Sequence, residues 1–203
     1  YANFPHVSRE TLNDLAIYEN YLLENNEKFN LIAKSTEKDI WNRHFLDSIQ
    51  LIDFIDKNCK VCADLGSGAG FPGLVLSIVA KERKLTTKFV LYEKSIKKSK
   101  FLNQISKKLN LKTEIISKNI FNQKKIAADI IMARAFKPVQ IILQLVHEKS
   151  ENLKNLLLFS GKNGKEKLLD ASKVWDFEYK QRRSLTCNDS LIISINKIIK
   201  KFE

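Results

Sequence analysis

Histidine and cysteine are scarce in this chain of 203 residues, which has three of each. A structural zinc site needs four such ligands, and none of His6, His44 and His147 has a second histidine at paired spacing. Cys59 and Cys62 form a CxxC pair, but the pair precedes and enters an apolar run, whereas a redox dithiol sits after a strand at a helix start. We therefore expect reduced thiols and no bound metal.

Long apolar runs are also missing. No stretch reaches the roughly 18 apolar residues that a membrane-spanning helix needs. Residues 1–5 lack the basic and then apolar pattern of a secretory signal. The sequence therefore predicts a cytoplasmic protein. A hydrophobic fraction of 44% suits one domain with a substantial core, which excludes fibrous and disordered classes.

Acidic residues are outnumbered by basic ones. The 35 Lys and Arg against 23 Asp and Glu give a formal net charge of +12. Such a charge favours an anionic partner such as a nucleic acid. However, most of these cations are lysine, a composition that an AT-rich genome also encodes, so charge alone leaves nucleic-acid binding open.

Glycine is rare too, yet three of the six glycines fall at alternate positions. Gly66, Gly68 and Gly70 directly follow the apolar run 61–65. Glycine takes backbone angles that a Cβ forbids, so such a turn brings its amides close to a ligand. Pro72 suits the first turn of a following helix. The pattern predicts a nucleotide-sized binding site, although dinucleotide-binding proteins, methyltransferases and structural turns all use this spacing.

Two kinds of periodicity divide the chain near residue 57. Up to that point apolar residues recur at helical spacing, and Thr36 with Asp39 forms a capping box that predicts the start of a second helix. We expect residues 1–57 to form a helical extension packed on a core of residues 58–203. In the core, strands are expected at 61–65, 88–92, 113–117, 129–133, 155–159, 174–183 and 190–195, and helices at 72–82, 95–109, 138–149 and 164–173.

Strands that alternate with helices predict an α/β fold with a mostly parallel, seven-stranded sheet of Rossmann-like type. A short connection joins the last two strands, so we expect them to form an antiparallel hairpin. Ligands of such sheets bind at the carboxyl ends of the strands, near the point where strand order reverses. Four of these ends, at residues 64–66, 92–93, 117–120 and 133–134, should therefore surround one site.

Two acidic residues mark this expected edge of the sheet. Asp64 ends the first strand, where its carboxylate can accept hydrogen bonds from turn amides or from a ligand amine. Glu93 ends the second strand, 23 residues after Gly70, where an acidic side chain can accept hydrogen bonds from both hydroxyls of a ribose. NAD and S-adenosylmethionine both contain such a ribose, so the pattern does not choose between them.

Five segments together resemble one protein family. They are, in chain order, Phe29-Asn30-Leu31, Arg43-His44-Phe45-Leu46-Asp47-Ser48, the glycine segment Asp64 to Gly73, Lys97-Lys98-Ser99-Lys100-Phe101-Leu102 and Ala133-Arg134-Ala135-Phe136. The chain resembles the ribosomal RNA methyltransferases that methylate N7 of a guanine in 16S RNA, also called glucose-inhibited division protein B. The resemblance implies the S-adenosylmethionine-dependent methyltransferase fold and, as target, a guanine in the 530 loop. We expect a monomer whose partner is 16S ribosomal RNA or the small ribosomal subunit.

The resemblance also implies where S-adenosylmethionine lies. The expected cofactor-binding residues are Asp64, Gly66, Ser67, Gly68, Gly70, Phe71, Glu93, Asn119, Ile120 and Arg134. Glu93 is expected to hold the ribose, and Asn119 and Ile120 to lie against the adenine. Methylation of N7 removes no proton, so no catalytic acid or base is expected, and Arg134 is a positioning candidate.

Cations around this edge are expected to contact RNA. They are Arg43, Lys118, Lys137, Lys162, Arg182 and Arg183. The chain departs from the family pattern in three places: residues 118–120 contain no acid, Ser160 stands where a lysine precedes Gly161, and 188–190 lacks an arginine. Three of the named cations, at positions 162, 182 and 183, could compensate for the two missing ones.

Two alternative functions remain open at this stage. A nicotinamide-dependent oxidoreductase would use the same glycine loop, but no acid is evident that could protonate a carbonyl. A non-catalytic RNA-binding protein on a cofactor-binding fold would account for the missing cations. His44 and Asp47 lie three residues apart on one expected helix face, where they could pin the N-terminal layer to the core.

Overall fold

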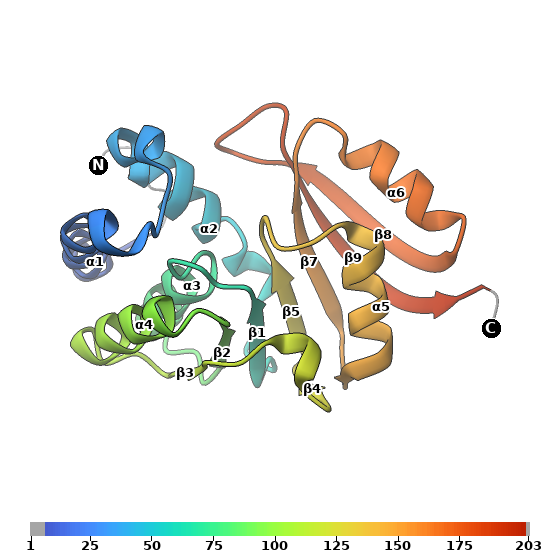
Figure 1. Ribbon diagram of the computed structural model, residues 1–203, viewed down its shortest axis with the longest axis horizontal. Coiled ribbons are helices and arrows are strands. Elements are labelled where there is room, and N and C mark those ends of the chain that lie inside the picture. The colour runs from blue at the N-terminus through green and yellow to red at the C-terminus, as the bar shows by residue number, and fades with distance from the viewer. Residues whose placement is uncertain (1–6, 202–203) are drawn as a thin grey trace.

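The apolar runs become the strands of one seven-stranded sheet in the computed structural model, which describes residues 7–201 (Figure 1). The strand order is β3-β2-β1-β5-β7-β9-β8. Strands β1, β2, β3, β5 and β7 are parallel, and β9 pairs antiparallel with β7 and β8. The strands are β1 (Val61–Leu65), β2 (Lys88–Tyr92), β3 (Thr113–Ile116), β5 (Ile130–Ala133), β7 (Asn155–Ser160), β8 (Trp175–Arg183) and β9 (Leu191–Lys200). The predicted α/β class, parallel sheet and C-terminal hairpin are confirmed.

Helices cover both faces of this sheet because its central strands, β1, β2, β5 and β7, are buried on both sides. Alternate residues of β1 show the division, since Cys62 packs in one core and Ala63 in the other. The N-terminal elements, α3 and α4 pack over the first core, and α5 and α6 over the second. The core helices are α3 (Gly73–Glu82), α4 (Ile96–Lys108), α5 (Val139–Lys149) and α6 (Gly164–Ser172).

Two elements escaped prediction because they are very short. Strands β4 (Ile126–Ala127) and β6 (Ser150–Glu151) pair in parallel as a separate small sheet, and two residues show no periodicity. A single 3-10 turn, η4 (Ile120–Asn122), follows β3, and Asn119 caps it through its side-chain oxygen.

The second predicted N-terminal helix forms over residues 40–49, but its turns are mostly π-helical, and its predicted start at Thr36 is wrong. Helix α1 (Arg9–Phe29) forms as expected, but the rest of the layer is made of short pieces: η1 (Lys34–Asp39), the π-helical η2 (Trp41–Leu46), α2 (Asp47–Ile49) and η3 (Ile52–Phe54). Thr36 lies inside η1 and donates its hydroxyl to the Ala33 carbonyl at 2.8 Å, so it does not cap a helix. The wider π turn changes which way the following side chains face, and such turns are frequent at functional sites.

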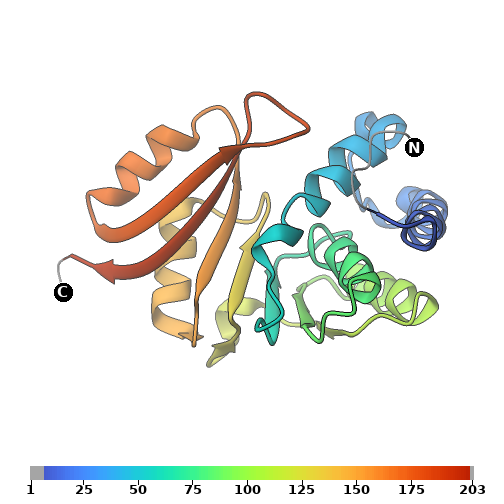
Figure 2. The ribbon, with the colours of Figure 1, turned by 180° about the vertical axis from the view of Figure 1, so that it is seen from behind.

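The N-terminal layer packs against the glycine segment and helices α3 and α4, as the view from behind also shows (Figure 2). Tyr18 of α1 is fully buried, and its hydroxyl donates to the Ala69 carbonyl. Its ring centroid lies 5.4 Å from that of Phe45 and 5.7 Å from that of Phe71. One aromatic cluster therefore joins the layer to the glycine loop, while a domain boundary after residue 57 stays a prediction.

Within residues 7–201, no helix combines the length and apolar character needed to cross a membrane. In the same range, which leaves out His6, no group of three His, Cys, Asp or Glu side chains is arranged to hold a metal ion. Cys59 and Cys62 are buried free thiols whose Sγ atoms lie 3.4 Å apart. The cytoplasmic location and the absence of a metal stay predictions.

Candidate functional site

The glycine loop leaves β1 at the centre of the sheet, where strand order reverses between β1 and β5. Gly66, Gly68 and Gly70 all have positive φ, at +70°, +57° and +106°. The backbone amides of Gly66 and Ser67 donate to the Tyr92 carbonyl at 2.9 and 3.0 Å, so the end of β2 holds the loop. A Cβ on Gly66 would lie 2.4 Å from the ring of Phe136, which is why this position has no side chain.

Both expected acidic residues support this loop. Asp64 Oδ2 accepts the amide hydrogen of Gly73 at 3.0 Å. Glu93 accepts from the amides of Gly68 (2.9 Å, Oε2) and Ser95 (2.7 Å, Oε1). The prediction that Asp64 accepts from a turn amide is confirmed at the start of α3, whereas the bond from Gly68 to Glu93 was not foreseen.

Asp64 keeps one oxygen without a partner. The residue is only 1% exposed, and Oδ1 is buried without a hydrogen bond among the described residues, although the Ser67 hydroxyl, which donates to the Asp64 carbonyl at 3.2 Å, lies nearby. Burial, the largest effect, raises the pKa of Asp64 to about 6, while the amide of Gly73 and the hydroxyl of Ser67 act against this rise. A buried acceptor without a donor is costly in a folded protein, so this oxygen suits a ligand that brings a donor.

A cavity of about 280 Å³ opens beside the glycine loop at the ends of β2 and β3. Its lining includes Gly66, Glu93, Lys118, Asn119, Ile120, Phe121 and Phe136. Ile120 borders it although its side chain is 3% exposed, and the Asn119 side-chain oxygen is bonded to the Phe121 amide at 3.1 Å. Phe121 and Phe136 stack at 6.1 Å between centroids. The cavity thus has an acidic end at Glu93 and an aromatic wall.

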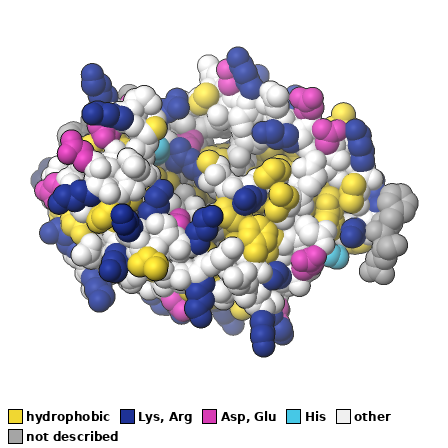
Figure 3. Space-filling view, viewed as in Figure 1, with side chains coloured by type: hydrophobic (Ala, Val, Ile, Leu, Met, Phe, Trp, Pro, Cys, Tyr) yellow, Lys and Arg dark blue, Asp and Glu magenta, His cyan; other side chains and the backbone are white. Residues whose placement is uncertain are grey.

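A second cavity, of about 580 Å³, adjoins the first across residues 135–137, which line both. Its walls come from the N-terminal layer, the ends of β5 and β7, α6 and the turn between β8 and β9, through residues that include Arg43, Asp47, Arg134, Phe159, Lys167 and Cys187. In Figure 3 many Lys and Arg side chains surround the hollow on this face. Two adjoining cavities can hold two reacting groups next to each other.

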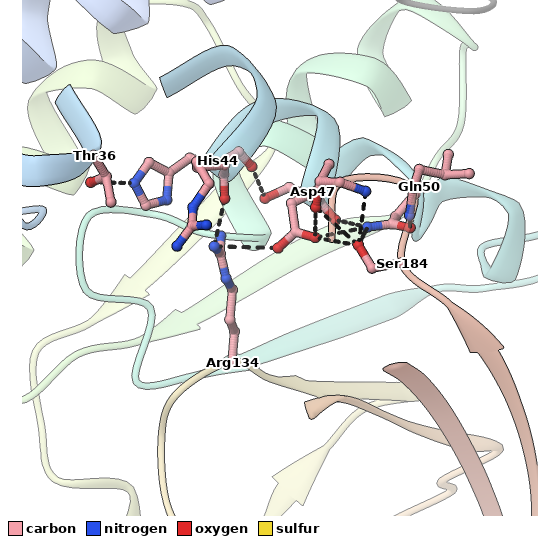
Figure 4. Close-up of polar contacts among 10 residues, drawn as sticks. Thr36, His44, Asp47, Gln50, Arg134 and Ser184 are labelled. Carbon is pink, nitrogen blue, oxygen red and sulfur yellow. Dashed lines mark hydrogen bonds and ion pairs between the residues drawn. The ribbon is translucent and has the colours of Figure 1, made fainter. Parts of the chain in front are cut away.

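Arg134 lines the 580 Å³ cavity, and its guanidinium reaches the N-terminal layer (Figure 4). Its Nη2 donates to the Arg43 carbonyl at 2.6 Å and lies 3.3 Å from Asp47 Oδ2. Its Nη1 is buried and has no acceptor among residues 7–201. Burial lowers the pKa of Arg134, and the carboxylate of Asp47 opposes that change. One edge of the guanidinium is held by protein, and the other can bind a ligand acceptor.

His44 joins the N-terminal layer to the glycine loop, as expected for a structural residue. Its ring stacks on Phe71 at 4.7 Å between centroids, and Nε2 lies 3.0 Å from the Thr36 hydroxyl. Burial, assisted by Arg134 and Arg43, lowers the pKa of His44 to about 4. The imidazole is therefore neutral near pH 7.

Of the six cations expected to contact RNA, five have exposed side chains and the sixth, Arg182, is partly buried. Arg43, Lys118, Lys137 and Arg183 are exposed and line the cavities or a neighbouring groove of about 310 Å³. Lys162 is exposed but pairs with Asp189 at 3.5 Å. Their contacts with RNA stay predictions.

Arg182 differs because the N-terminal layer already binds it. Its Nη2 donates to the Gln50 carbonyl, and its Cζ lies 5.0 Å from the ring centroid of Phe54. The sequence also missed Lys167 and Phe136 as cavity residues. Phe136 belongs to the segment 133–136 that carries the family resemblance, but no role was expected for it, and Lys167 belongs to no motif. The packing of α6 and of the segment after β5 brings them to the site.

Comparison with known proteins identifies the family. The family model described as GidB, rRNA small subunit methyltransferase G, matches residues 11–193. The ribosomal RNA small subunit methyltransferase G of Pelagibacter ubique (strain HTCC1062) is 44% identical over 208 residues, covering 99% of this chain and 98% of that protein. The protein of the same name from Rickettsia akari (strain Hartford) is 36% identical, covering 96% of this chain and 98% of its own.

Solved structures support the fold. The PH0226 protein from Pyrococcus horikoshii OT3 has a TM-score of 0.60 at 12% identity, covering 87% of this chain and 98% of that one. The 16S rRNA methylase RmtB has a TM-score of 0.55 at 12% identity, covering 95% and 76% of the two chains. The family match and the full-length relatives confirm the resemblance drawn from the sequence. The chain belongs to the GidB family, the small-subunit rRNA methyltransferases G.

Proposed function

We propose that this member of the family transfers the methyl group of S-adenosylmethionine to N7 of a guanine in the 530 loop of 16S ribosomal RNA. The observation that carries the proposal is the pair of adjoining cavities that share residues 135–137. The 280 Å³ cavity borders the glycine loop and would take the adenosine part of the donor, whose methionine part would extend towards Arg134 at the edge of the 580 Å³ cavity. The 580 Å³ cavity lies within the size range of small-ligand sites and would take the acceptor base.

The unpartnered polar atoms fit the methionine end of S-adenosylmethionine. Its ammonium group needs an acceptor, and Asp64 Oδ1 is buried without a donor. Its carboxylate needs a donor, and Arg134 Nη1 is buried without an acceptor. When bound, the cofactor supplies an electrophilic methyl group on a sulfonium.

The 280 Å³ cavity beside the glycine loop fits the adenosine part of the cofactor. Glu93 keeps acceptor capacity for ribose hydroxyls, because each carboxylate oxygen can accept more than the one amide it holds. Ile120, Phe121 and Phe136 offer apolar surface for an adenine. The expected roles of these residues therefore stay compatible with their positions.

The reaction requires the protein to position the two reactants and requires no proton transfer. Guanine N7 carries an in-plane lone pair, and its methylation releases no proton. Correct placement of two reactants contributes about 7–11 kcal/mol to such a transfer, and the base must leave its stack or lie in an open loop. Arg134 would orient the donor, while Arg43, Lys118 and Lys137 would bind RNA phosphates near the cavity rim.

Methyl transfer tests the proposal directly. Purified protein is mixed with labelled S-adenosylmethionine and small ribosomal subunits from a strain that lacks this gene, and the labelled nucleotide is mapped. We expect label at N7 of one guanine in the 530 loop. Label at another atom or loop would refute the proposed acceptor. Saturable NADH binding, or RNA binding without cofactor binding, would instead favour the oxidoreductase or the non-catalytic alternative.

Cofactor affinity should depend on pH through Asp64. Its pKa of about 6 means that below pH 6 the carboxyl is protonated and must lose that proton before it can accept from the ammonium group. The dissociation constant of S-adenosylhomocysteine, measured by calorimetry, is therefore expected to rise about tenfold from pH 7 to pH 5. His44, with a pKa of about 4, stays largely neutral over this range.

The matched control for this pH dependence is Asp64→Asn. The variant should bind more weakly at pH 7 and show no change between pH 5 and pH 7, because the titrating group is gone. A wild-type affinity that is flat over the same range would remove Asp64 from the ammonium site.

A further inference from the structure

One carboxylate joins three segments that are far apart in the chain. Asp47 of α2 is 7% exposed and borders the 580 Å³ cavity. Its Oδ1 accepts hydrogen bonds from Ser184 Oγ at 2.9 Å, Thr186 Oγ1 at 2.7 Å and Gln50 Nε2 at 2.9 Å. Its Oδ2 faces Arg134 Nη2 at 3.3 Å (Figure 4). The two oxygens of the Asp47 side chain thus bind residues of two different walls of the cavity.

The first wall is the turn between β8 and β9, residues 184–190. Thr186, Cys187 and Ser190 of this turn line the cavity. Backbone hydrogen bonds close the turn on itself, from Ser184 N to Ser190 O at 2.8 Å and from Ser190 N to Cys187 O at 3.0 Å. Side-chain bonds fix the closed turn to α2 through Asp47 Oδ1 and through Gln50, whose Oε1 accepts from the Leu185 amide at 3.0 Å.

The second wall is the end of β5, where one edge of the Arg134 guanidinium carries Nη1, which is buried and has no acceptor among the described residues. A guanidinium is planar and rigid, so holding Nη2 also sets the direction of Nη1. Nη2 has two partners, the Arg43 carbonyl and Asp47 Oδ2, and only Asp47 carries a negative charge. The ion pair is well shielded, with side-chain exposures of 20% for Arg134 and 10% for Asp47.

We propose that Asp47 is a positioning residue with two separable functions. Oδ2 orients Arg134 so that Nη1 meets the carboxylate of S-adenosylmethionine, and Oδ1 fixes the 184–190 turn as the wall against which the RNA nucleotide docks. The inference rests on the proposed function for the cofactor role of Arg134. It assigns one carboxylate to the binding of both substrates, through different atoms and different partners.

Two sets of substitutions separate the functions. Asp47→Asn keeps an oxygen that can accept from Ser184 and Thr186 but places an amide NH₂ towards Arg134. We expect it to raise the dissociation constant of S-adenosylhomocysteine at least tenfold and to change the KM for small ribosomal subunits less than twofold. The double variant Ser184→Ala with Thr186→Val should do the reverse, raising the KM for subunits about tenfold at unchanged cofactor affinity.

The matched control is Asp53→Asn, the same chemical change in the same layer. Asp53 is an exposed carboxylate that lies 3.7 Å from Arg83 Nη1 and 4.0 Å from Arg182 Nη1 and does not contact the Asp47 cluster. We expect neither constant to change. Melting curves of all variants report whether each one folds.

The outcomes distinguish this inference from the function on which it rests. If wild-type protein fails to methylate 16S RNA, the proposed function is wrong. If wild-type methylates, Arg134→Ala weakens cofactor binding and Asp47→Asn does not, the positioning by Asp47 is wrong by itself. The proposal would also be overturned if Asp47→Asn and the Ser184→Ala, Thr186→Val double variant changed the dissociation constant of the cofactor and the KM for subunits by the same factors.

A variant of the partner residue covers the case in which Asp47→Asn does not fold. Arg134→Lys keeps a positive charge beside Asp47 but has a single nitrogen, so it cannot hold Asp47 and the cofactor through two separate nitrogens. We expect the tenfold loss of cofactor affinity without a change in the KM for subunits. Unchanged cofactor affinity in a folded Arg134→Lys protein would overturn the proposed orientation.

Discussion

Gly70→Ala is expected to lower the free energy of unfolding by about 2–5 kcal/mol. Gly70 has φ of +106°, which residues with a Cβ rarely adopt, and the added carbon would lie 2.5 Å from Tyr18 Oη and 2.7 Å from Leu74 Cδ1. Neither neighbour can move easily. Both are fully buried, and the Tyr18 hydroxyl is bonded to the Ala69 carbonyl. Overpacking and backbone strain therefore add at this position.

Urea unfolding of Gly70→Ala measures this loss, and Gly161→Ala serves as its control. A Cβ on Gly161 would meet no atom within 4 Å, and its φ is not positive, so we expect a change within about 0.5 kcal/mol. If the two variants unfold at the same urea concentration, Tyr18 does not confine the glycine loop, and the link between the N-terminal layer and the loop is wrong.

The sheet and the glycine loop could be predicted because their signals are local. The central strands β1, β2, β5 and β7 are short apolar runs, and the observed strands β1 and β2 have the bounds that the runs 61–65 and 88–92 indicate. The loop was recognisable because positive φ is easiest for glycine, so the positions that need this backbone conformation appear as glycines in the sequence. The hairpin followed from a connection too short for a parallel crossover.

The N-terminal layer shows that a periodic apolar pattern does not determine the pitch of a helix or its contacts with distant segments. Apolar residues between 40 and 51 recur at helical spacing, yet the backbone there passes from a π turn to a short α turn, and 3-10 turns precede and follow it. These changes of pitch let Phe45 enter the core, His44 stack on Phe71 and Asp47 reach the turn between β8 and β9. Such contacts depend on distant segments, and a local pattern carries no information on them.

The site was predictable in its parts but not in its connections. The motifs containing Asp47 and Arg134 were both identified, but nothing in a single sequence shows that they form an ion pair or that Ser184 shares the carboxylate. Likewise, Arg182 was expected at the RNA because it is a cation near the last strand. In the structure Arg182 also contacts Gln50 and Phe54, which is set by the fold of the N-terminal layer, while its contact with RNA stays a prediction.

Gly68→Asp is expected to weaken cofactor binding at least 100-fold while the protein still folds. A Cβ on Gly68 meets only the Gly66 carbonyl, at 3.9 Å, so the protein has room for a side chain. Its φ of +57° lies in the region that aspartate tolerates better than most residues. The Gly68 amide donates to Glu93 at 2.9 Å, so the new carboxylate would lie near the expected ribose site and add a second negative charge there.

Calorimetric titration with S-adenosylhomocysteine, beside a melting curve, measures both parts of this expectation. Gly161→Asp adds the same side chain at another open position, on the 580 Å³ cavity, and should leave cofactor affinity within twofold of wild type. Gly68→Ala separates the volume of the side chain from its charge, and we expect an intermediate affinity. Normal cofactor binding by a folded Gly68→Asp protein would mean that S-adenosylmethionine does not lie over the glycine loop, and the donor would then have to be sought in the 580 Å³ cavity.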